Sequence, residues 1–349
     1  SAPGEHKGYE YSRSKNPTRN ALEKNLAAIE GGKYGIAFGS GMAAVSAVIQ
    51  LLKPGDHVIS TNDLYGGSYR LFTKVFEQYG VDFSFVPMGS AEEVEASLKV
   101  NTKLIWVETP TNPMLNIIDI RAMSEMARAH GIHLAVDNTF ASPYLQQPLE
   151  LGADIVVHSA TKYLGGHSDV VLGGLVVEDK KLAERLYFIQ NSIGAIPGPM
   201  DCYLVLRGIK TLHLRMKQHC ESANQIAKFL HGHDAVENVY YPGLEWHQNH
   251  DIAKRQMHGF GGMVSFSVKG NNLNDANTVI SNLRVFTLAE SLGGVESLVG
   301  HPATMTHASI PKVEREKIGI VDSLIRLSVG VEETFDLIND LKQALNLIK

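Results

Sequence analysis

The stretch HSATKYLGGHSD, residues 158–169, places Lys162 directly after two hydroxyl residues and shortly before a glycine pair. The preceding run ADIVV (153–157) has the length and β-branched content of a buried parallel strand, so Lys162 is expected at or just past a strand end. There, Ser159 and Thr161 would project to the same side and could hold an anion beside the amine. A partly desolvated lysine can attack a carbonyl group, whereas the simpler alternative is a solvent-facing lysine beside a polar turn.

Short apolar strands alternate with helical segments up to Val177, which predicts an α/β domain with a mainly parallel sheet. The expected strands are YGIAF (34–38), HVIST (57–61), VDFSFVP (81–87), KLIWVETP (103–110), IHLAVDN (132–138), ADIVV and VVLGGLVV (170–177). Residues 199–231 are predicted to form one helix, bent at Gly208. A thinner pattern follows, so we expect a large α/β domain over residues 16–231 and a smaller C-terminal α+β domain over residues 232–349.

Composition limits the class of ligand. The 349 residues are 44% hydrophobic and 20% charged, as in globular proteins with a large core. The 32 Lys and Arg against 37 Asp and Glu give a net charge of −5, so we expect a small-molecule ligand and neither nucleic acid nor a membrane surface as partner. Two cysteines and the absence of a long apolar stretch favour a soluble, cytoplasmic protein.

Ligands of open parallel sheets collect at the carboxyl ends of the strands, so the residues at the other strand ends matter. Gly41 and Met42 follow the first strand, and their backbone N–H groups at a helix N-terminus could bind phosphate; a plain glycine turn into a buried helix is the alternative. Asp137 follows the strand IHLAV. Its carboxylate could keep a nitrogen heterocycle protonated, or it could simply cap the next helix.

Two further residues complete a constellation. Asn112 could hydrogen-bond a phenolic oxygen of the same ring, or be a turn asparagine before proline. Tyr65 could stack on a planar ligand, or be a core tyrosine. Phosphate donors, a ring-facing carboxylate, a stacking tyrosine and a nucleophilic lysine together describe pyridoxal 5′-phosphate (PLP) joined to Lys162 as a Schiff base.

Other classes fit less well. A nicotinamide oxidoreductase would need a third glycine where Ala44 stands, and the segment lacks the lysine of a Walker A loop. HQNHD (247–251) and HGHD (231–234) lack a third ligand nearby, so no metal site is expected. A non-catalytic scaffold of the same fold stays open as an alternative.

The chain resembles the cystathionine γ-lyase, γ-synthase and β-lyase group of the PLP-dependent enzymes of Cys/Met metabolism, which have fold type I. The resemblance covers almost the whole chain. It rests on YEYSRSKNPTR (9–19), GSGM (39–42), DLYGG (63–67), ETPTNP (108–113), VDNTFASP (136–143), HSATKYLGGHSDV (158–170), TLAESLGGVESL (287–298), MTHAS (305–309) and LIRLSVGVE (324–332).

The resemblance implies roles at the cofactor. Lys162 would carry PLP and shuttle protons, Asp137 would pair with the ring nitrogen, and the catalytic Tyr65 would stack on the ring. Asn112 would lie near the phenolic oxygen, and the phosphate would be held by Gly41, Met42, Ser159 and Thr161. Tyr11 and Arg13 would reach the phosphate of a neighbouring subunit, so residues 1–15 are expected to form an arm of a dimer that is usually paired into a tetramer.

The resemblance also implies a substrate site. Arg326 would grip the α-carboxylate, a bidentate task that suits guanidinium, and its place in the apolar run LIRLSV argues against a surface ion pair. The other expected substrate contacts are Glu290, Ser291, Asn112 and Tyr11.

The sequence limits the choice of reaction less strictly than it identifies the site residues. A glutamate at position 290 accompanies γ-acting members of the group, whereas dedicated bacterial β-lyases tend to carry tyrosine there. Gly67 stands where methionine γ-lyases tend to carry cysteine. We therefore expect a carbon–sulfur lyase, cystathionine γ-lyase, which forms cysteine, 2-oxobutyrate and ammonia. Cystathionine γ-synthase and cystathionine β-lyase, which forms homocysteine, pyruvate and ammonia, remain alternatives.

Overall fold

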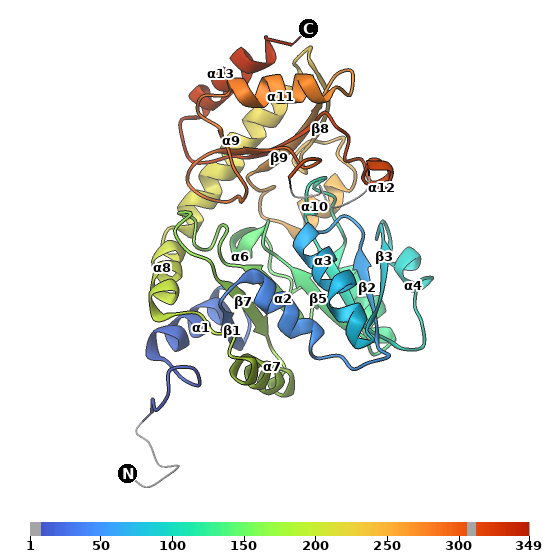
Figure 1. Ribbon diagram of the computed structural model, residues 1–349, viewed down its shortest axis with the longest axis vertical. Coiled ribbons are helices and arrows are strands. Elements are labelled where there is room, and N and C mark those ends of the chain that lie inside the picture. The colour runs from blue at the N-terminus through green and yellow to red at the C-terminus, as the bar shows by residue number, and fades with distance from the viewer. Residues whose placement is uncertain (1–7, 306–311, 349) are drawn as a thin grey trace.

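A seven-stranded sheet forms the centre of the larger part of the protein in the computed structural model, which describes residues 8–305 and 312–348 (Figure 1). Its order is β1-β7-β6-β5-β4-β2-β3. The strands are β1 (Tyr34–Phe38), β2 (His57–Thr61), β3 (Asp82–Val86), β4 (Thr102–Glu108), β5 (His133–Asp137), β6 (Ile155–Ser159) and β7 (Gly173–Val177). All neighbouring pairs from β6 to β3 are parallel, and only β7 runs antiparallel to its neighbours. The prediction of a mainly parallel sheet is confirmed.

Helices cover both faces of this sheet, because its strands are apolar on both sides. The helices around it are α1 (Pro17–Ile29), α2 (Gly41–Ile49), α3 (Gly66–Lys74), α4 (Ala91–Glu95), α5 (Ile120–Ala129), α6 (Ser142–Leu145), α7 (Lys180–Ile193) and the 3₁₀ turn η1 (Phe76–Tyr79). Trp106 belongs to a hydrophobic cluster with residues of α2, α3 and α7, whereas its neighbour Val107 belongs to a second cluster with residues of α4 and α5. The predicted alternation of strands and helices therefore corresponds to a three-layer arrangement, with the sheet between two layers of helices.

Residues 199–231 form two helices, so the prediction of a single helix bent at Gly208 is wrong. Helix α8 (Pro199–Ile209) ends just before Lys210, and α9 (Leu212–His231) begins two residues later. Gly208 lies inside α8, where the missing side chain lets the helix approach another backbone segment. Cys202 on α8 and Cys220 on α9 are both free thiols. In the part of the chain described, no helix has the length and apolarity needed to cross a membrane.

A second sheet, of order β10-β11-β12-β9-β8, forms the C-terminal part. Its strands are β8 (Val236–Tyr240), β9 (Met263–Val268), β10 (Thr287–Leu288), β11 (Leu298–Gly300) and β12 (Leu324–Ser328); the helices are α10 (His250–Gln256), α11 (Leu273–Asn282), α12 (Lys312–Lys317) and α13 (Thr334–Leu345). Helix α9 joins the two parts, as Figure 1 shows, because Met216 packs in the core of the first part and Ile226 in that of the second.

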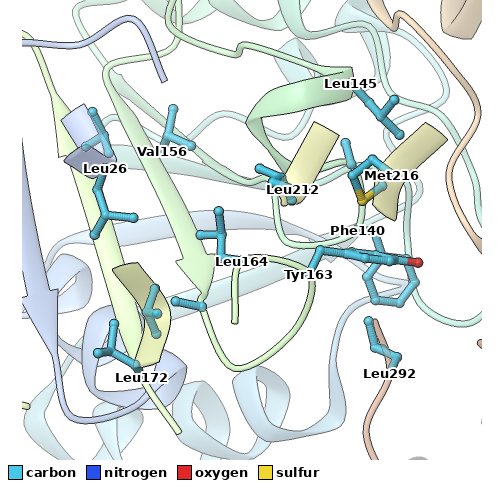
Figure 2. Close-up of a cluster of buried hydrophobic side chains, with 14 of the residues drawn as sticks. Leu26, Phe140, Leu145, Val156, Tyr163, Leu164, Leu172, Leu212, Met216 and Leu292 are labelled. Carbon is cyan, nitrogen blue, oxygen red and sulfur yellow. The ribbon is translucent and has the colours of Figure 1, made fainter. Parts of the chain in front are cut away.

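Lys162 lies in the connection that turns the chain from β6 into the antiparallel β7. Its neighbours Tyr163 and Leu164 are buried in a cluster with Phe140, Met216 and Leu292, shown in Figure 2. Since these neighbours are fixed in the core, the lysine loop has little freedom to move.

Replacing Gly208 with alanine should destabilise the protein. A Cβ at this position would lie 2.2 Å from the carbonyl oxygen of Gly165, so α8 would be pushed off the lysine loop. Such overpacking costs about 1–3 kcal/mol. The matched control is Gly232→Ala, where the nearest atom to a Cβ would be 3.7 Å away. Thermal unfolding should show a lower melting temperature for Gly208→Ala alone; equal values for both variants would contradict the account.

Candidate active site

A cavity of about 400 Å³ lies at the carboxyl ends of the strands, where the C-terminal part faces the first sheet. The predicted residues that line it are Gly41, Met42, Tyr65, Asn112, Asp137, Ser159, Thr161, Lys162, Glu290, Ser291 and Arg326. They come from elements that are far apart in the sequence. The strand-end rule accounts for the residues that follow the strands of the first sheet, whereas Glu290, Ser291 and Arg326 are expected only from the family resemblance.

The Lys162 amine is held inside this cavity. Its Nζ donates a hydrogen bond to Ser291 Oγ at 2.8 Å. Burial and, to a smaller extent, the positive charge of Arg326 lower the pKa of Lys162, Glu290 acts in the opposite direction, and the net pKa is about 8. The amine is therefore neutral in about a tenth of the molecules at pH 7, far more than for an ordinary lysine, and the neutral form is the one that acts as a nucleophile or general base.

Ser291 has an unusual backbone conformation. Its φ is +100°, in the region that favours glycine, and such strain costs about 1–3 kcal/mol. The strained residue turns its side chain to Lys162, while its carbonyl oxygen accepts a 3.2 Å hydrogen bond from Arg326 Nη2. The strained conformation thus lets Ser291 accept hydrogen bonds from both Lys162 and Arg326.

Helix α2 begins at one end of the cavity and suits an anion. Ser40 caps the helix by accepting a hydrogen bond from Ala43 N at 3.0 Å, and the first turn contains no acidic residue. A Cβ on Gly41 would lie 2.8 Å from Ser159 Cβ, so only glycine lets this hydroxyl residue approach the helix start. The first N–H groups of a helix have no intrahelical partner, and they attract phosphate. The Thr161 hydroxyl is also engaged with the backbone of Leu172.

Asp137 ends β5 and lines the same cavity. One carboxylate oxygen accepts a hydrogen bond from Thr139 N at 3.0 Å. Burial raises the pKa of Asp137, whereas His158 on the next strand lowers it. A cationic ring nitrogen beside this carboxylate would offset its burial, so the residues fit a protonated pyridine ring.

Arg326 lies on β12 and is 4% exposed, so it is not part of a surface ion pair. Its Nη1 donates to Asn112 Oδ1 at 2.9 Å, which links the second sheet to the ETPTNP segment. Burial lowers the pKa of Arg326 to about 10. A buried guanidinium whose hydrogen bonds go to neutral oxygens is suited to receive a carboxylate.

Tyr65 precedes α3, and its side chain is partly exposed at the cavity. A Cβ on Gly67 would lie 2.3 Å from the Tyr65 ring, so this glycine leaves room for the ring. The backbone N–H of Tyr65 donates to Glu108 Oε2 at 2.8 Å. The position of the ring is thus set by Glu108 and by Gly67.

Tyr11 and Arg13 do not line the cavity of their own chain. The Arg13 guanidinium lies 5.2 Å from the Tyr11 ring centre, and its Nη1 donates to Asn191 O at 2.6 Å. The buried guanidinium of Arg19 donates to three carbonyl oxygens of the segment: those of Ser12 at 3.1 Å, Arg13 at 3.0 Å and Ser14 at 2.9 Å. The donation of Tyr11 and Arg13 to a second chain stays a prediction. The rest of the MTHAS segment, residues 306–309, lies outside the described residues.

Sequence reasoning missed several buried polar residues next to the cavity. Glu108 belongs to a quoted motif and ends a strand, so the strand-end rule could have found it. Glu30, after α1, pairs with His158, and no local pattern signals this contact over 128 residues. In the HQNHD segment, His250 Nδ1 donates a hydrogen bond to the Pro242 carbonyl oxygen at 2.7 Å. The described residues contain no group of three His, Cys, Asp or Glu side chains placed to hold a metal ion.

The buried amine, a helix start suited to phosphate and the buried carboxylate at one sheet edge are together typical of one class, the PLP-dependent enzymes of fold type I. Residues 1–346 match the family described as Cys/Met metabolism PLP-dependent enzyme. The chain belongs to this family, so the predicted family, fold class and cofactor are confirmed.

Relatives cover nearly the whole chain. A cystathionine β-lyase of Coxiella burnetii is 55% identical over 346 residues, which span 99% of this chain and 89% of that protein. A cystathionine γ-lyase of Bacillus subtilis is 54% identical over 345 residues, which span 99% and 90%. The structure of a cystathionine γ-lyase from Lactobacillus plantarum complexed with L-serine has a TM-score of 0.97 at 47% identity, covering 99% of this chain and 90% of that one.

Covalent capture of PLP by the apoenzyme should depend on the pKa of Lys162. Since only the neutral amine attacks an aldehyde, the capture rate should rise roughly tenfold per pH unit below about pH 8 and level off above it. Stopped-flow measurement of the visible absorbance tests this. Lys162→Arg should abolish capture, whereas Lys217→Arg, an exposed position on α9, should behave as the wild type. A rate that keeps rising beyond pH 10 would show an ordinary lysine.

Proposed function

We propose that the chain is a cystathionine γ-lyase, which converts cystathionine and water into cysteine, 2-oxobutyrate and ammonia. The observation that carries this proposal is the carboxylate of Glu290 in the same cavity as Arg326 and Lys162. Cystathionine has an α-carboxylate at one end and a second amino group at the other, and these two charges suit Arg326 and Glu290 respectively.

Bound PLP supplies an electron sink for the bond to the α-carbon of the substrate. Lys162 takes the proton from this carbon and then one from the β-carbon, because its amine is the basic group in the cavity and its pKa is near 8. Ser291 orients the amine through the 2.8 Å hydrogen bond. γ-Elimination needs both proton transfers, whereas β-elimination needs only the first.

The roles of the other residues follow from their positions. Arg326 holds the α-carboxylate, and Asn112 orients Arg326 and contacts the ring oxygen. Asp137 keeps the ring nitrogen protonated, Tyr65 covers the ring, and the remaining cofactor contacts, Gly41, Met42, Ser159 and Thr161, bind the phosphate. These assignments give the residues of this chain the roles that its family membership leads us to propose.

β-Elimination is the second candidate, because a relative that is 55% identical is named a cystathionine β-lyase. It would need the same amine and the same cofactor contacts, so the cavity is compatible with both reactions. γ-Replacement on an activated homoserine is a third possibility, since it uses the same two proton transfers.

Analysis of the products distinguishes these reactions. With cystathionine as substrate, we expect 2-oxobutyrate and cysteine in equal amounts, measured by chromatography of the derivatised oxo acids and thiols. Lys162→Ala should abolish turnover with the fold retained, because it removes the base.

Pyruvate and homocysteine as main products would identify a β-lyase instead. Turnover only with an acylated homoserine and cysteine would identify a γ-synthase. A protein that binds PLP but acts on none of these compounds would be a scaffold.

We further propose that the active sites are shared in a dimer, and that two dimers form a tetramer. Tyr11 and Arg13 precede α1, whose N-terminal side leads to the lower end of the molecule in Figure 1, and neither residue lines the cavity of its own chain. Arg13 suits a phosphate group, which it could reach only in another copy of the chain.

Hybrid dimers test the sharing of sites. In an equal mixture of Arg13→Ala and Lys162→Ala chains, half of the dimers are hybrids and each hybrid has one intact site, so activity should recover to about a quarter of wild type. The mixture is made by co-expression, with the parents as controls at limiting PLP. If Arg13 acted within its own chain, mixing would restore nothing.

A further inference from the structure

A second carboxylate lies next to Asp137 at the cavity. Glu108 ends β4, Asp137 ends β5, and the two residues are paired in the parallel register. Neighbouring strands are about 4.8 Å apart, and paired residues of parallel strands point to the same side. Glu108 is 6% exposed, and both residues line the cavity. The sheet edge therefore presents two acidic groups where one ring nitrogen is to be held.

Glu108 also fixes the backbone that carries the stacking ring. Its Oε2 accepts the N–H of Tyr65 at 2.8 Å, and its Oε1 accepts a longer, 3.4 Å hydrogen bond from Trp106 Nε1. Helix α3 starts directly after Tyr65, which is its N-cap residue and makes no side-chain capping hydrogen bond. Glu108 accepts the backbone N–H of this N-cap residue, as the glutamate of a capping box does, and so holds the backbone from which the Tyr65 ring projects.

Glu108 has acidic neighbours, whereas Asp137 also has a histidine on its other side. Burial, Asp137 and Asp63 raise the pKa of Glu108 to about 8. On the far side of Asp137, His158 on β6 lowers the pKa of Asp137. The cations Lys162 and Arg326 and the anion Glu290 line the same cavity.

We propose that Glu108 is a positioning residue for the cofactor, which holds the Tyr65 ring over the cavity and adds negative charge beside Asp137. The inference rests on the proposed roles of Tyr65 and Asp137. The added charge strengthens the attraction for a protonated ring nitrogen, whereas the hydrogen bond to Tyr65 acts whether or not Glu108 is charged.

The two effects depend differently on pH. The pKa of Glu108 is raised, so its charge is present above about pH 8 and is lost as the pH falls through that value. The electrostatic part of cofactor binding should therefore be strongest above pH 8. Since Lys162 titrates in the same range, only the difference between variants that retain Lys162 isolates the contribution of Glu108.

The affinity of apoenzyme for PLP at pH 6.5 and pH 9 tests the proposal. Glu108→Gln keeps an acceptor oxygen for Tyr65 and removes the charge. The dissociation constant of PLP should therefore rise about tenfold at pH 9 and change little at pH 6.5. The tenfold change lies between the values expected for a charge pair in water and for one near a protein surface. Glu108→Leu should weaken binding at both pH values. It should also change the visible circular dichroism of bound PLP, which Glu108→Gln should preserve.

Two controls separate the possible failures. Glu125→Gln removes an exposed carboxylate on α5 and should leave PLP binding unchanged. If Asp137→Asn binds PLP like wild type, the proposed role of Asp137 fails. If Asp137→Asn binds weakly but Glu108→Gln matches Glu125→Gln at pH 9, only the inference about Glu108 is overturned. Should Glu108→Leu fail to fold, as judged by melting temperature, Glu108→Gln still decides.

Discussion

The hydrogen bond between Lys162 and Ser291 joins the two parts of the protein at the buried amine in the cavity. Lys162 belongs to the first sheet's connection between β6 and β7, and Ser291 belongs to the segment that precedes β11. A buried amine needs a partner, and this partner is available only when the second sheet is packed against the first. The low pKa of Lys162 and the placement of Arg326 both follow from that packing. The environment of the Lys162 amine therefore exists only when the two parts of the chain are packed together.

Much of this arrangement follows from the amino-acid sequence alone. Apolar runs identify the strands, and parallel strands bring their carboxyl ends to one edge, so Lys162 and Asp137 meet although 24 residues separate them in the sequence. Gly41 is predictable for the same reason, since a helix start at that edge needs a residue without a side chain. Local pattern and sheet geometry are sufficient for these residues.

Other features depend on contacts that no local pattern contains. Glu30 meets His158 because α1 folds back across the sheet, and the positive φ of Ser291 is imposed by its tertiary partners. The role of Gly208 is also tertiary, since a Cβ at this position inside α8 would lie 2.2 Å from the carbonyl oxygen of Gly165 in the lysine loop. In each case the feature depends on a residue that is distant in the sequence, so local propensity does not reveal it.

The guanidinium of Arg19 has a consequence for the start of the chain. It is 1% exposed, and its N–H groups depend on carbonyl oxygens that the segment Ser12–Ser14 provides. Proteolytic removal of that segment would leave a buried cation short of acceptors, which is among the costly defects of a folded protein. Loss of this N-terminal segment would thus lower the stability of the whole fold, and the lifetime of the protein would depend on its protection from proteases.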